Sequence, residues 1–263
     1  MSRADLMSST GAAISATGTP EFPAAITGLL RGIAPYSYTV AFGYRGASRP
    51  IDLYDDFPHE KRKVFVTEYQ AGAYLLDPFF LAASQPVVAD LYRLRDLAPD
   101  RFYQGEYFRN YYVRTGLADE IGYFVNLPGG AMVVLSLMRA EKPFSGRNLQ
   151  DLRELCPIVE ACLRRHWAGL SDRMDAAAHV SAIQTPVTRI EHSFHIFGAG
   201  VLTPRERQIV EHTLKGHSAE AVGRILEISP GTVRIHRRNI YAKLRISSQG
   251  ELFSKFIQTL GME

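Results

Sequence analysis

Three helix starts follow one another closely near the C-terminus, and their spacing limits how the chain can fold. Thr203-Pro204 combines an N-cap threonine with a proline at the first helical position, and Ser229-Pro230 repeats that arrangement with serine. Between them, Ser218 can cap a short helix. Only a few residues separate the second helix from the third, which is the spacing of a helix-turn-helix.

A fourth helix is expected after Ser248, because Ser248 and Glu251 form the pattern of a capping box. The apolar residues of this helix are Leu252, Phe253, Phe256, Ile257 and Leu260. They are numerous for one short helix, so one side of it is a candidate dimer contact. The sequence therefore predicts an all-α, four-helix module over residues 199–263.

The third helix of this module lies in a stretch whose charge has one sign only. From Ile228 to Ser248 there are five Lys or Arg residues and no Asp or Glu. Residues 199–263 hold ten Lys or Arg and six Asp or Glu, whereas the rest of the chain holds 20 and 21. A solvated helix face usually mixes both signs. We therefore expect the missing negative charge to come from a nucleic acid outside the chain.

The periodicity of the third helix separates an inner side from an outer side. The apolar sector consists of Val233, Ile240 and Leu244, and the opposite side consists of Arg234, Ile235, Arg238 and Ala242. Two arginines and an aliphatic residue on an exposed face suit a helix that lies in a major groove. Arg237 falls nearer the apolar sector, so its head is expected to reach a phosphate or an acidic neighbour.

The segments LTPRERQIV and GTVRIHRRNIYAKL resemble the DNA-binding domain of LuxR-type transcription regulators over about the last 65 residues. The resemblance implies that the third helix reads the major groove, with Arg234, Ile235 and Arg238 facing the bases. The full set of predicted DNA-contacting residues is Thr232, Arg234, Ile235, Arg237, Arg238, Asn239 and Lys243. Arg234 stands where the family often has lysine, so no operator sequence is implied. A basic bundle that binds protein is the alternative.

The rest of the chain alternates between helical and strand-like periodicity. Helical patterns occupy residues 21–33, 59–83 and 146–167, and strand-like patterns occupy residues 37–44, 120–127 and 131–137. The second helical region is expected to be interrupted at Asp77-Pro78, since proline disfavours helix in the residue before it. The last two strands flank Pro128-Gly129-Gly130, which predicts a β-hairpin. We expect an α+β sensor sandwich, an antiparallel sheet flanked by helices, before the helix-turn-helix domain. The predicted parts are a disordered tail (1–19), the sandwich (20–170), a linker (171–198) and the four-helix module (199–263).

The sandwich is rich in aromatic residues, which are common walls of small-molecule pockets. The stretch from Tyr69 to Pro78 resembles the pocket motif of autoinducer-binding domains, in which the aspartate accepts a ligand amide hydrogen. Val64 stands near the place of that motif's tryptophan, so the ligand is not assigned. The candidate ligand contacts are Tyr36, Tyr38, Tyr54, Tyr69, Tyr74, Asp77 and Phe79. Core packing explains aromatics equally well, and Asp before Pro is an ordinary helix start.

Catalytic and metal-binding patterns are weak in this sequence. Glu191-His192 and His195 form a possible pair of ligands without a third, and exposed connector residues are the simpler interpretation. Cys156 and Cys162 fall on or beside an apolar helix stripe, where burial makes thiols inert. We predict no enzyme activity, no cofactor and no metal site. We also expect no membrane span and a cytoplasmic location, since no apolar run approaches about 18 residues.

These patterns together predict a ligand-responsive regulator. The expected partners are operator DNA, an unidentified small-molecule effector and a second copy of the chain, with RNA polymerase as a possible further partner. The competing hypothesis is a constitutive or protein-controlled DNA-binding factor whose N-terminal domain is an interaction module without a ligand pocket. The resemblance does not identify the effector or the direction of regulation.

Overall fold

The computed structural model describes residues 1–46, 48–180, 194 and 196–260. The chain forms two compact units, each assembled from separate stretches of sequence. The first unit comprises Met1–Glu60, Ala82–Leu97 and Leu117–Thr185, and the second comprises Lys61–Leu81, Ala98–Gly116 and Pro186–Glu263. The expected sandwich of residues 20–170 is therefore divided between the units, because two of its helical segments associate with the C-terminal residues.

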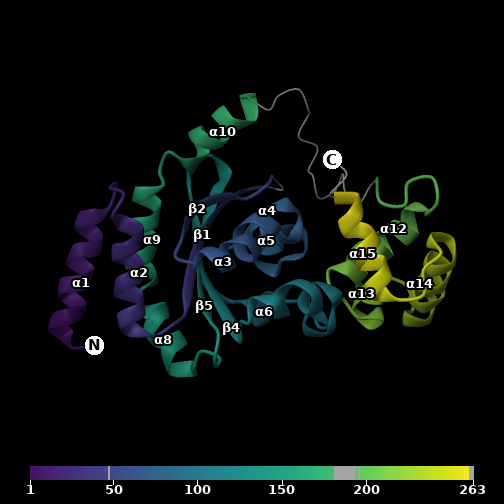
Figure 1. Ribbon diagram of the computed structural model, residues 1–263, viewed down its shortest axis with the longest axis horizontal. Helices are drawn as coiled ribbons and strands as arrows, with labels where there is room; N and C mark the ends of the chain where they lie inside the picture. Colours follow the sequence, from purple (N-terminus) through teal and green to yellow (C-terminus); the bar gives the residue numbers. More distant parts are fainter. Residues whose placement is uncertain (47, 181–193, 195, 261–263) are drawn as a thin grey trace. The chain divides into compact units, whose positions relative to one another are not determined.

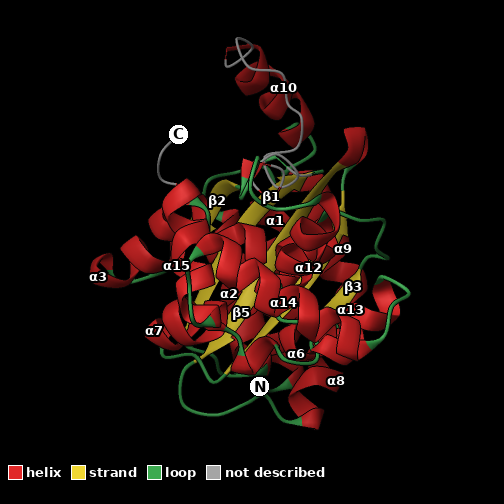
Figure 2. Cartoon of the chain, turned by 90° about the vertical axis from the view of Figure 1, so that its right-hand side faces the viewer, coloured by secondary structure: helices red, strands yellow, loops and turns green. Residues whose placement is uncertain are grey.

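A five-stranded antiparallel sheet forms the centre of the first unit, and Figure 2 shows its strands as one layer. The strands are β1 (Tyr38–Arg45), β2 (Ile51–Asp55), β3 (Asp90–Arg93), β4 (Asp119–Asn126) and β5 (Ala131–Arg139), in the order β2-β1-β5-β4-β3. Gly129 and Gly130, in η5 (Pro128–Gly130), both have φ near 73°, where residues with a β-carbon are strained. The predicted β4–β5 hairpin is thus confirmed.

Helices α2 (Phe22–Ile33), α8 (Gly146–Glu154) and α9 (Cys156–His166) lie along one face of this sheet, as Figure 1 shows. The sequence predicted one helix over 146–167, but the chain starts a new helix after Leu155, with Pro157 in its first turn. The core between helices and sheet is fully buried and includes Phe22, Ile26, Leu30, Val159, Leu163, Ile121, Val133 and Leu137. Burying one such side chain contributes about 1.5–3 kcal/mol. α10 (Leu170–Val180) then occupies the start of the expected linker.

The expected disordered tail is a helix in the structure, which corrects the prediction for residues 1–19. α1 (Arg3–Ala16) begins with a capping box, in which the Ser2 hydroxyl accepts from the Asp5 N–H and the Asp5 carboxylate accepts from the Ser2 N–H. Ala13 is fully buried in the core that α2 shares with the sheet. The helix was missed because its apolar residues do not gather on one side.

The other face of the sheet is also buried and is strongly aromatic. Strand alternation places Tyr38, Phe42 and Tyr44 on this face, opposite the face of Ala41. Tyr92 and Phe124 form an edge-to-face pair on it, with ring centroids 5.0 Å apart. Phe42, Tyr44 and Phe124 are each at most 5% exposed. The sheet thus has two apolar faces rather than one apolar and one polar face.

Short helices make up the first two segments of the second unit. In the first segment they are η1 (Lys63–Glu68), α4 (Tyr69–Ala71), η2 (Ala73–Leu76) and α5 (Pro78–Ala83), which follow α3 (His59–Arg62). In the second they are η3 (Phe102–Gln104), η4 (Phe108–Tyr112) and α7 (Val113–Thr115), which follow α6 (Leu94–Leu97). The helical region over 59–83 is interrupted at Asp77-Pro78, as predicted, and is also broken at Gly72, which was not predicted. Phe102 forms aromatic contacts with Tyr107 and Phe108 that hold η3 against η4.

The C-terminal module consists of α12 (Pro204–Leu214), α13 (Ala219–Ile225), α14 (Pro230–Leu244) and α15 (Gln249–Leu260). The side chains of Thr203, Ser218, Ser229 and Ser248 each accept a backbone N–H, so all four predicted caps are present. The predicted capping box at Ser248 is incomplete, because the Glu251 carboxylate accepts from the Ser247 N–H instead. Phe194 stacks on Phe256 at 4.6 Å between ring centroids, and Phe197 contacts Phe256 edge to face at 5.6 Å. The apolar side of α15 therefore packs inside the module, and Ile257 is its exposed large apolar residue. Among the described residues, no helix has both the length and the hydropathy to cross a bilayer.

Candidate nucleic-acid interface

Helix α14 is anchored by its apolar side, so its opposite side faces outward. Val233 and Ile240 are at most 1% exposed and fix the helix on α12 and α13. The Ser229 hydroxyl accepts the Thr232 N–H at 3.0 Å and contacts the Thr232 hydroxyl at 2.8 Å, which orders the first turn. Arg234, Ile235, Arg238 and Asn239 are exposed. Ile235 is 54% exposed, so an apolar side chain lies on the outward face together with the two arginines.

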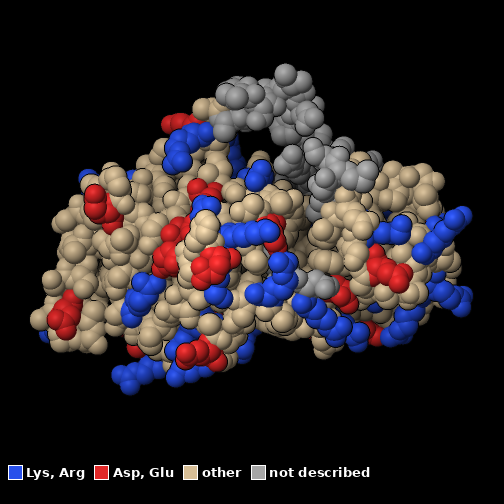
Figure 3. Space-filling model, viewed as in Figure 1, with Lys and Arg blue, Asp and Glu red and all other residues tan. Residues whose placement is uncertain are grey.

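Arg234 and Arg238 both remain at the outer surface. Arg234 forms an ion pair with Glu220 of α13, and the two side chains are 62% and 48% exposed. The arginine is therefore not neutralised in the protein interior, and an exposed pair of this kind is weak enough to exchange partners. Figure 3 shows basic side chains gathered over the part of the surface that α12–α15 form. This charge distribution is the electrostatic signature of nucleic-acid binding.

Arg237 and Lys243, both in the predicted set of DNA contacts, bind protein groups in the structure. Arg237 is half-buried, as its place near the apolar sector predicted, whereas Lys243 is exposed. The Arg237 guanidinium donates to the Thr213 hydroxyl and to the His217 carbonyl, both at 3.2 Å, and burial lowers its pKa. Lys243 donates to the Glu206 carboxylate at 2.7 Å. Each of these basic groups therefore has an acceptor within the C-terminal module. They brace the helix rather than extend the outward face.

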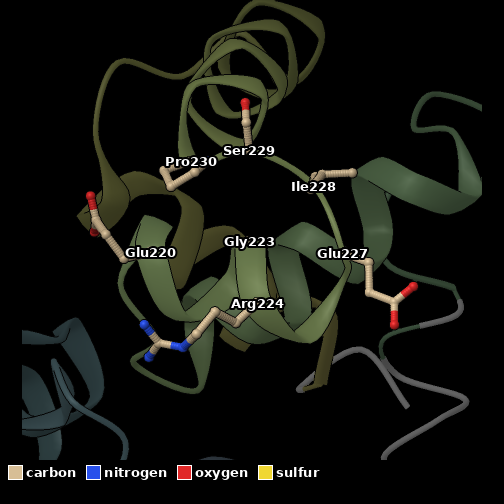
Figure 4. Close-up of a pocket in the computed structure, with 7 residues that line it drawn as sticks. All are labelled: Glu220, Gly223, Arg224, Glu227, Ile228, Ser229 and Pro230. Atoms are coloured by element: carbon tan, nitrogen blue, oxygen red, sulfur yellow. The ribbon is translucent and has the colours of Figure 1, made fainter.

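An open hollow of about 520 Å³ separates α13 from the start of α14. Figure 4 shows Glu220 and Glu227 at its opposite ends, with Ser229 and Pro230 at the start of α14. Gly223 forms the floor, because a β-carbon there would lie 2.7 Å from the Ile228 carbonyl oxygen. The sequence analysis missed this close approach, although a glycine inside a helix is a signal that could have indicated it.

The seven candidate ligand contacts fall into separate groups. Tyr36 and Tyr54 lie on the α2 side of the sheet, where the Tyr36 hydroxyl donates to the Thr27 carbonyl at 2.7 Å. Burial raises the pKa of Tyr36 to about 12. Tyr38 lies on the opposite, aromatic face and contacts Phe57, with ring centroids 5.6 Å apart. Tyr36 and Tyr38 therefore cannot line the same face of the sheet.

The other four candidates do come together, in the second unit. The Tyr69 hydroxyl donates to Asp77 Oδ2 at 2.6 Å, and the Phe79 N–H donates to Asp77 Oδ1 at 3.1 Å. Tyr74 contacts Tyr69 edge to face at 6.2 Å between ring centroids. Burial raises the pKa of Asp77 to about 6, although the bonds from Tyr69, Phe79 and Phe80 act in the opposite direction. Asp77 is thus the cap of α5, and protein donors already occupy both of its oxygens.

The proposed metal ligands Glu191, His192 and His195 lie outside the described residues. Within the described part of the chain there is no cluster of His, Cys, Asp or Glu suited to a metal ion. Both cysteines are free thiols. Burial, together with the nearby Asp90 carboxylate, raises the pKa of Cys156 to about 11, so its thiol is protonated and a poor nucleophile at neutral pH.

Comparison with known proteins agrees with this geometry. Residues 200–256 match the family described as GerE, the luxR family of bacterial regulatory proteins. The chain is 31% identical over 186 residues to a putative HTH-type transcriptional regulator from Aeromonas salmonicida, which covers 70% of this chain and 94% of that protein. It is 28% identical to the monoamine regulon transcriptional regulator of Klebsiella aerogenes, over 57% of this chain and 54% of that protein.

One solved structure resembles the N-terminal part. The VqsR LBD domain from Pseudomonas aeruginosa has 26% sequence identity and a TM-score of 0.54, covering 61% of this chain and 94% of that domain. Three findings are consistent with one family. They are the antiparallel sheet with flanking helices, the family match of the C-terminal helix-turn-helix, and the similarity to a relative over 94% of its length. The chain therefore belongs to the luxR family of bacterial regulatory proteins and is a DNA-binding transcription regulator.

Proposed function

We propose that the protein is a ligand-responsive, sequence-specific regulator that acts as a homodimer in the cytoplasm, where operator DNA lies. The outward face of α14 reads the operator, and the N-terminal residues respond to a small molecule. The observation that carries the DNA-binding part is the exposure of Arg234, Ile235 and Arg238 on one face of a helix whose other face is locked in place. A dimer presents two such helices to two half-sites. RNA polymerase is a further proposed partner, and catalysis has no part in this function.

The aromatic face of the sheet supports the sensing part of the proposal. Tyr38, Phe42, Tyr44 and Phe124 provide a wall of the kind that binds small apolar or aromatic molecules. The similarity to the VqsR LBD domain points in the same direction. We therefore propose that the effector contacts this face, with Tyr38 as the member of the predicted set that lies on it.

A contact inside the second unit offers a route from the N-terminal residues to the C-terminal module. The Arg101 N–H donates to the Gly216 carbonyl at 2.9 Å, and the Ser218 N–H donates to the Asp100 carboxylate at 3.0 Å. Arg237 of α14 binds the same turn through the His217 carbonyl. An effector that shifts the segment around Asp100 would therefore change how the recognition helix is held.

The alternative is a regulator without a small-molecule effector, controlled by a protein partner or not controlled at all. The hydrogen bonds of Asp77 favour this alternative. Both oxygens of the carboxylate already accept from protein donors, so it needs no ligand amide. A thermal-shift screen separates the two, since a sensor gains RT ln(1 + [L]/Kd) of stability from its effector. A single class of small molecule that raises the melting temperature supports sensing, and a flat response over a broad library supports the alternative.

The DNA-binding part is tested by selecting an operator from a pool of random-sequence duplexes with the full-length protein. Arg238→Ala should cost about 1–3 kcal/mol in binding to the selected duplex at fixed salt, and should relax the base preference at one position of each half-site. Lys255→Ala is the matched control, because Lys255 is also exposed but lies on α15. Equal affinity and unchanged preference for Arg238→Ala would contradict the groove assignment.

A further inference from the structure

Glu220 is an acidic residue beside the outward face of a basic helix. It lies in the first turn of α13, and its carboxylate forms an ion pair with Arg234 of α14. Among the described residues, α14 forms this ion pair and the pair Lys243–Glu206. The second pair braces the module from inside, since Glu206 is only 4% exposed. The first has no such structural purpose, because both of its members stand in solvent.

The position of Glu220 relative to Arg234 is fixed by the packing of α13 on the start of α14. A β-carbon at Gly223 would lie 2.7 Å from the Ile228 carbonyl oxygen, so α13 packs closely on the turn that leads into α14. The Ser218 hydroxyl caps α13 by accepting the Ala221 N–H at 3.0 Å. Figure 4 shows Glu220 and Glu227 on either side of the hollow in front of α14. Negative charge is therefore held beside the end of the helix that enters a groove.

Glu220 is charged at neutral pH. Its pKa is lowered, chiefly by a hydrogen bond from its own backbone N–H and further by the nearby positive charges of Arg234 and Arg101. A carboxylate at this place repels DNA phosphates whatever the base sequence. The energy of the exposed pair with Arg234 is small, so a good acceptor on a base edge can replace it.

We propose that Glu220 is a specificity-determining residue that acts through Arg234. In the free protein it holds the Arg234 guanidinium, and on random DNA it opposes binding. A matching base edge compensates by accepting hydrogen bonds from the released guanidinium, so the carboxylate penalises non-cognate DNA more than cognate DNA. This inference rests on the proposed groove assignment of α14.

The test compares wild type with Glu220→Gln, which keeps the shape of the side chain and removes its charge. Affinity is measured as a function of salt for the selected operator and for a scrambled duplex of equal length. Glu220→Gln should bind the scrambled duplex roughly 3–10-fold more tightly, with a salt dependence steeper by about one phosphate contact. Affinity for the operator should change less, so the ratio of the two affinities should fall.

Two control variants distinguish this role from a general effect of charge. Glu211→Gln removes an equal charge from α12, where Glu211 pairs with Lys215, and it should leave the ratio unchanged. Glu220→Asp keeps the carboxylate and should retain most of the wild-type ratio. In an Arg234→Gln background, Glu220→Gln should alter the ratio much less than it does in wild type, because the residue through which it acts is gone.

The failure of this inference is distinct from failure of the proposed function. If wild type enriches no sequence from the random pool, the groove assignment itself is wrong. If wild type enriches an operator and Glu220→Gln has the wild-type affinity ratio, Glu220 does not determine specificity. An equal fall in the ratio for Glu211→Gln would likewise overturn the proposal, since net charge alone would then account for the effect.

Discussion

The charged side chains of helix α14 and the charged side chain of Asp77 differ in their solvent exposure and in their hydrogen bonding. Arg234 and Arg238 stand in solvent at the surface of the C-terminal module, whereas Asp77 is half-buried and accepts hydrogen bonds from Tyr69 and Phe79. Burying a charged group is costly unless protein donors or acceptors replace water. The protein donors offset only part of that cost at Asp77, whose pKa stays raised, and the cost does not arise at Arg234 and Arg238. Free hydrogen-bonding capacity, rather than charge as such, marks the surface that awaits a partner.

Arg237 shows that the same distinction operates within one helix. It neighbours Arg238 in sequence, yet its guanidinium binds Thr213 and His217 while Arg238 is exposed. The angle between successive residues on the helix is enough to turn one arginine inward and the next outward. A count of basic residues would therefore overestimate the number of contacts that α14 makes with DNA.

The largest expected effect concerns Asp77 and the dependence of stability on pH. Its pKa is raised by burial from 3.8 to about 6, so the native state keeps a proton that the unfolded state releases. The stability from this group is fully present below pH 3.8 and is lost as the pH rises through about 6, by up to about 3 kcal/mol. Asp77→Asn, which is neutral at every pH, should lack this loss.

Urea unfolding of both proteins at several pH values between 4 and 7 measures the effect. The difference in the free energy of unfolding between Asp77→Asn and wild type should grow in favour of the variant as pH rises. If the free energies of unfolding of the two proteins change in parallel with pH, Asp77 is not held in the protonated form. Asp77 would then resemble Arg234 and Arg238 as a group open to a partner.

A smaller effect is expected from removing Arg237. Arg237→Ala deletes two hydrogen bonds and the packing of a long stem, so it should lower the free energy of unfolding by about 2 kcal/mol. Arg238→Ala is the matched variant and should change stability by less than about 0.5 kcal/mol. Chemical denaturation checks both values. Equal destabilisation by the two substitutions would remove the proposed difference between the inner and outer sides of α14.

The C-terminal module could be predicted from sequence because its determinants are local. Ser218 and Ser229 each cap a helix through an N–H only three residues away, so a short stretch contains the whole signal. The sheet is different, since β2 and β3 are short edge strands whose existence depends on pairing with β1 and β4. Nothing within Ile51–Asp55 alone indicates a partner strand. The division of the sandwich between two units is likewise a property of distant contacts.

The candidate site was predicted in part for the same reason. Helical periodicity was sufficient to place Arg234, Ile235 and Arg238 outward and Val233 and Ile240 inward. It could not show that Lys243 would meet Glu206, because that partner lies on another helix. The ligand contacts depended most on tertiary structure. Tyr36 and Tyr38 are two residues apart in sequence but lie on opposite faces of the sheet, since the chain enters β1 only after Tyr36.

The smallest expected effect concerns Asp100. It is exposed, as Arg234 is, but it accepts a backbone hydrogen bond, as Asp77 does. Its carboxylate accepts the Ser218 N–H in the second unit. Asp100→Ala should leave that amide without its acceptor and lower the protection of Ser218 against hydrogen exchange by about 1 kcal/mol. Asp96→Ala is the control, because Asp96 is exposed and lies outside this contact. If the protection of Ser218 is unchanged in Asp100→Ala, the exposed Asp100 carboxylate does not stabilise the turn at Ser218. Burial would then be what distinguishes charged groups that bind within the protein from those that remain open to a partner.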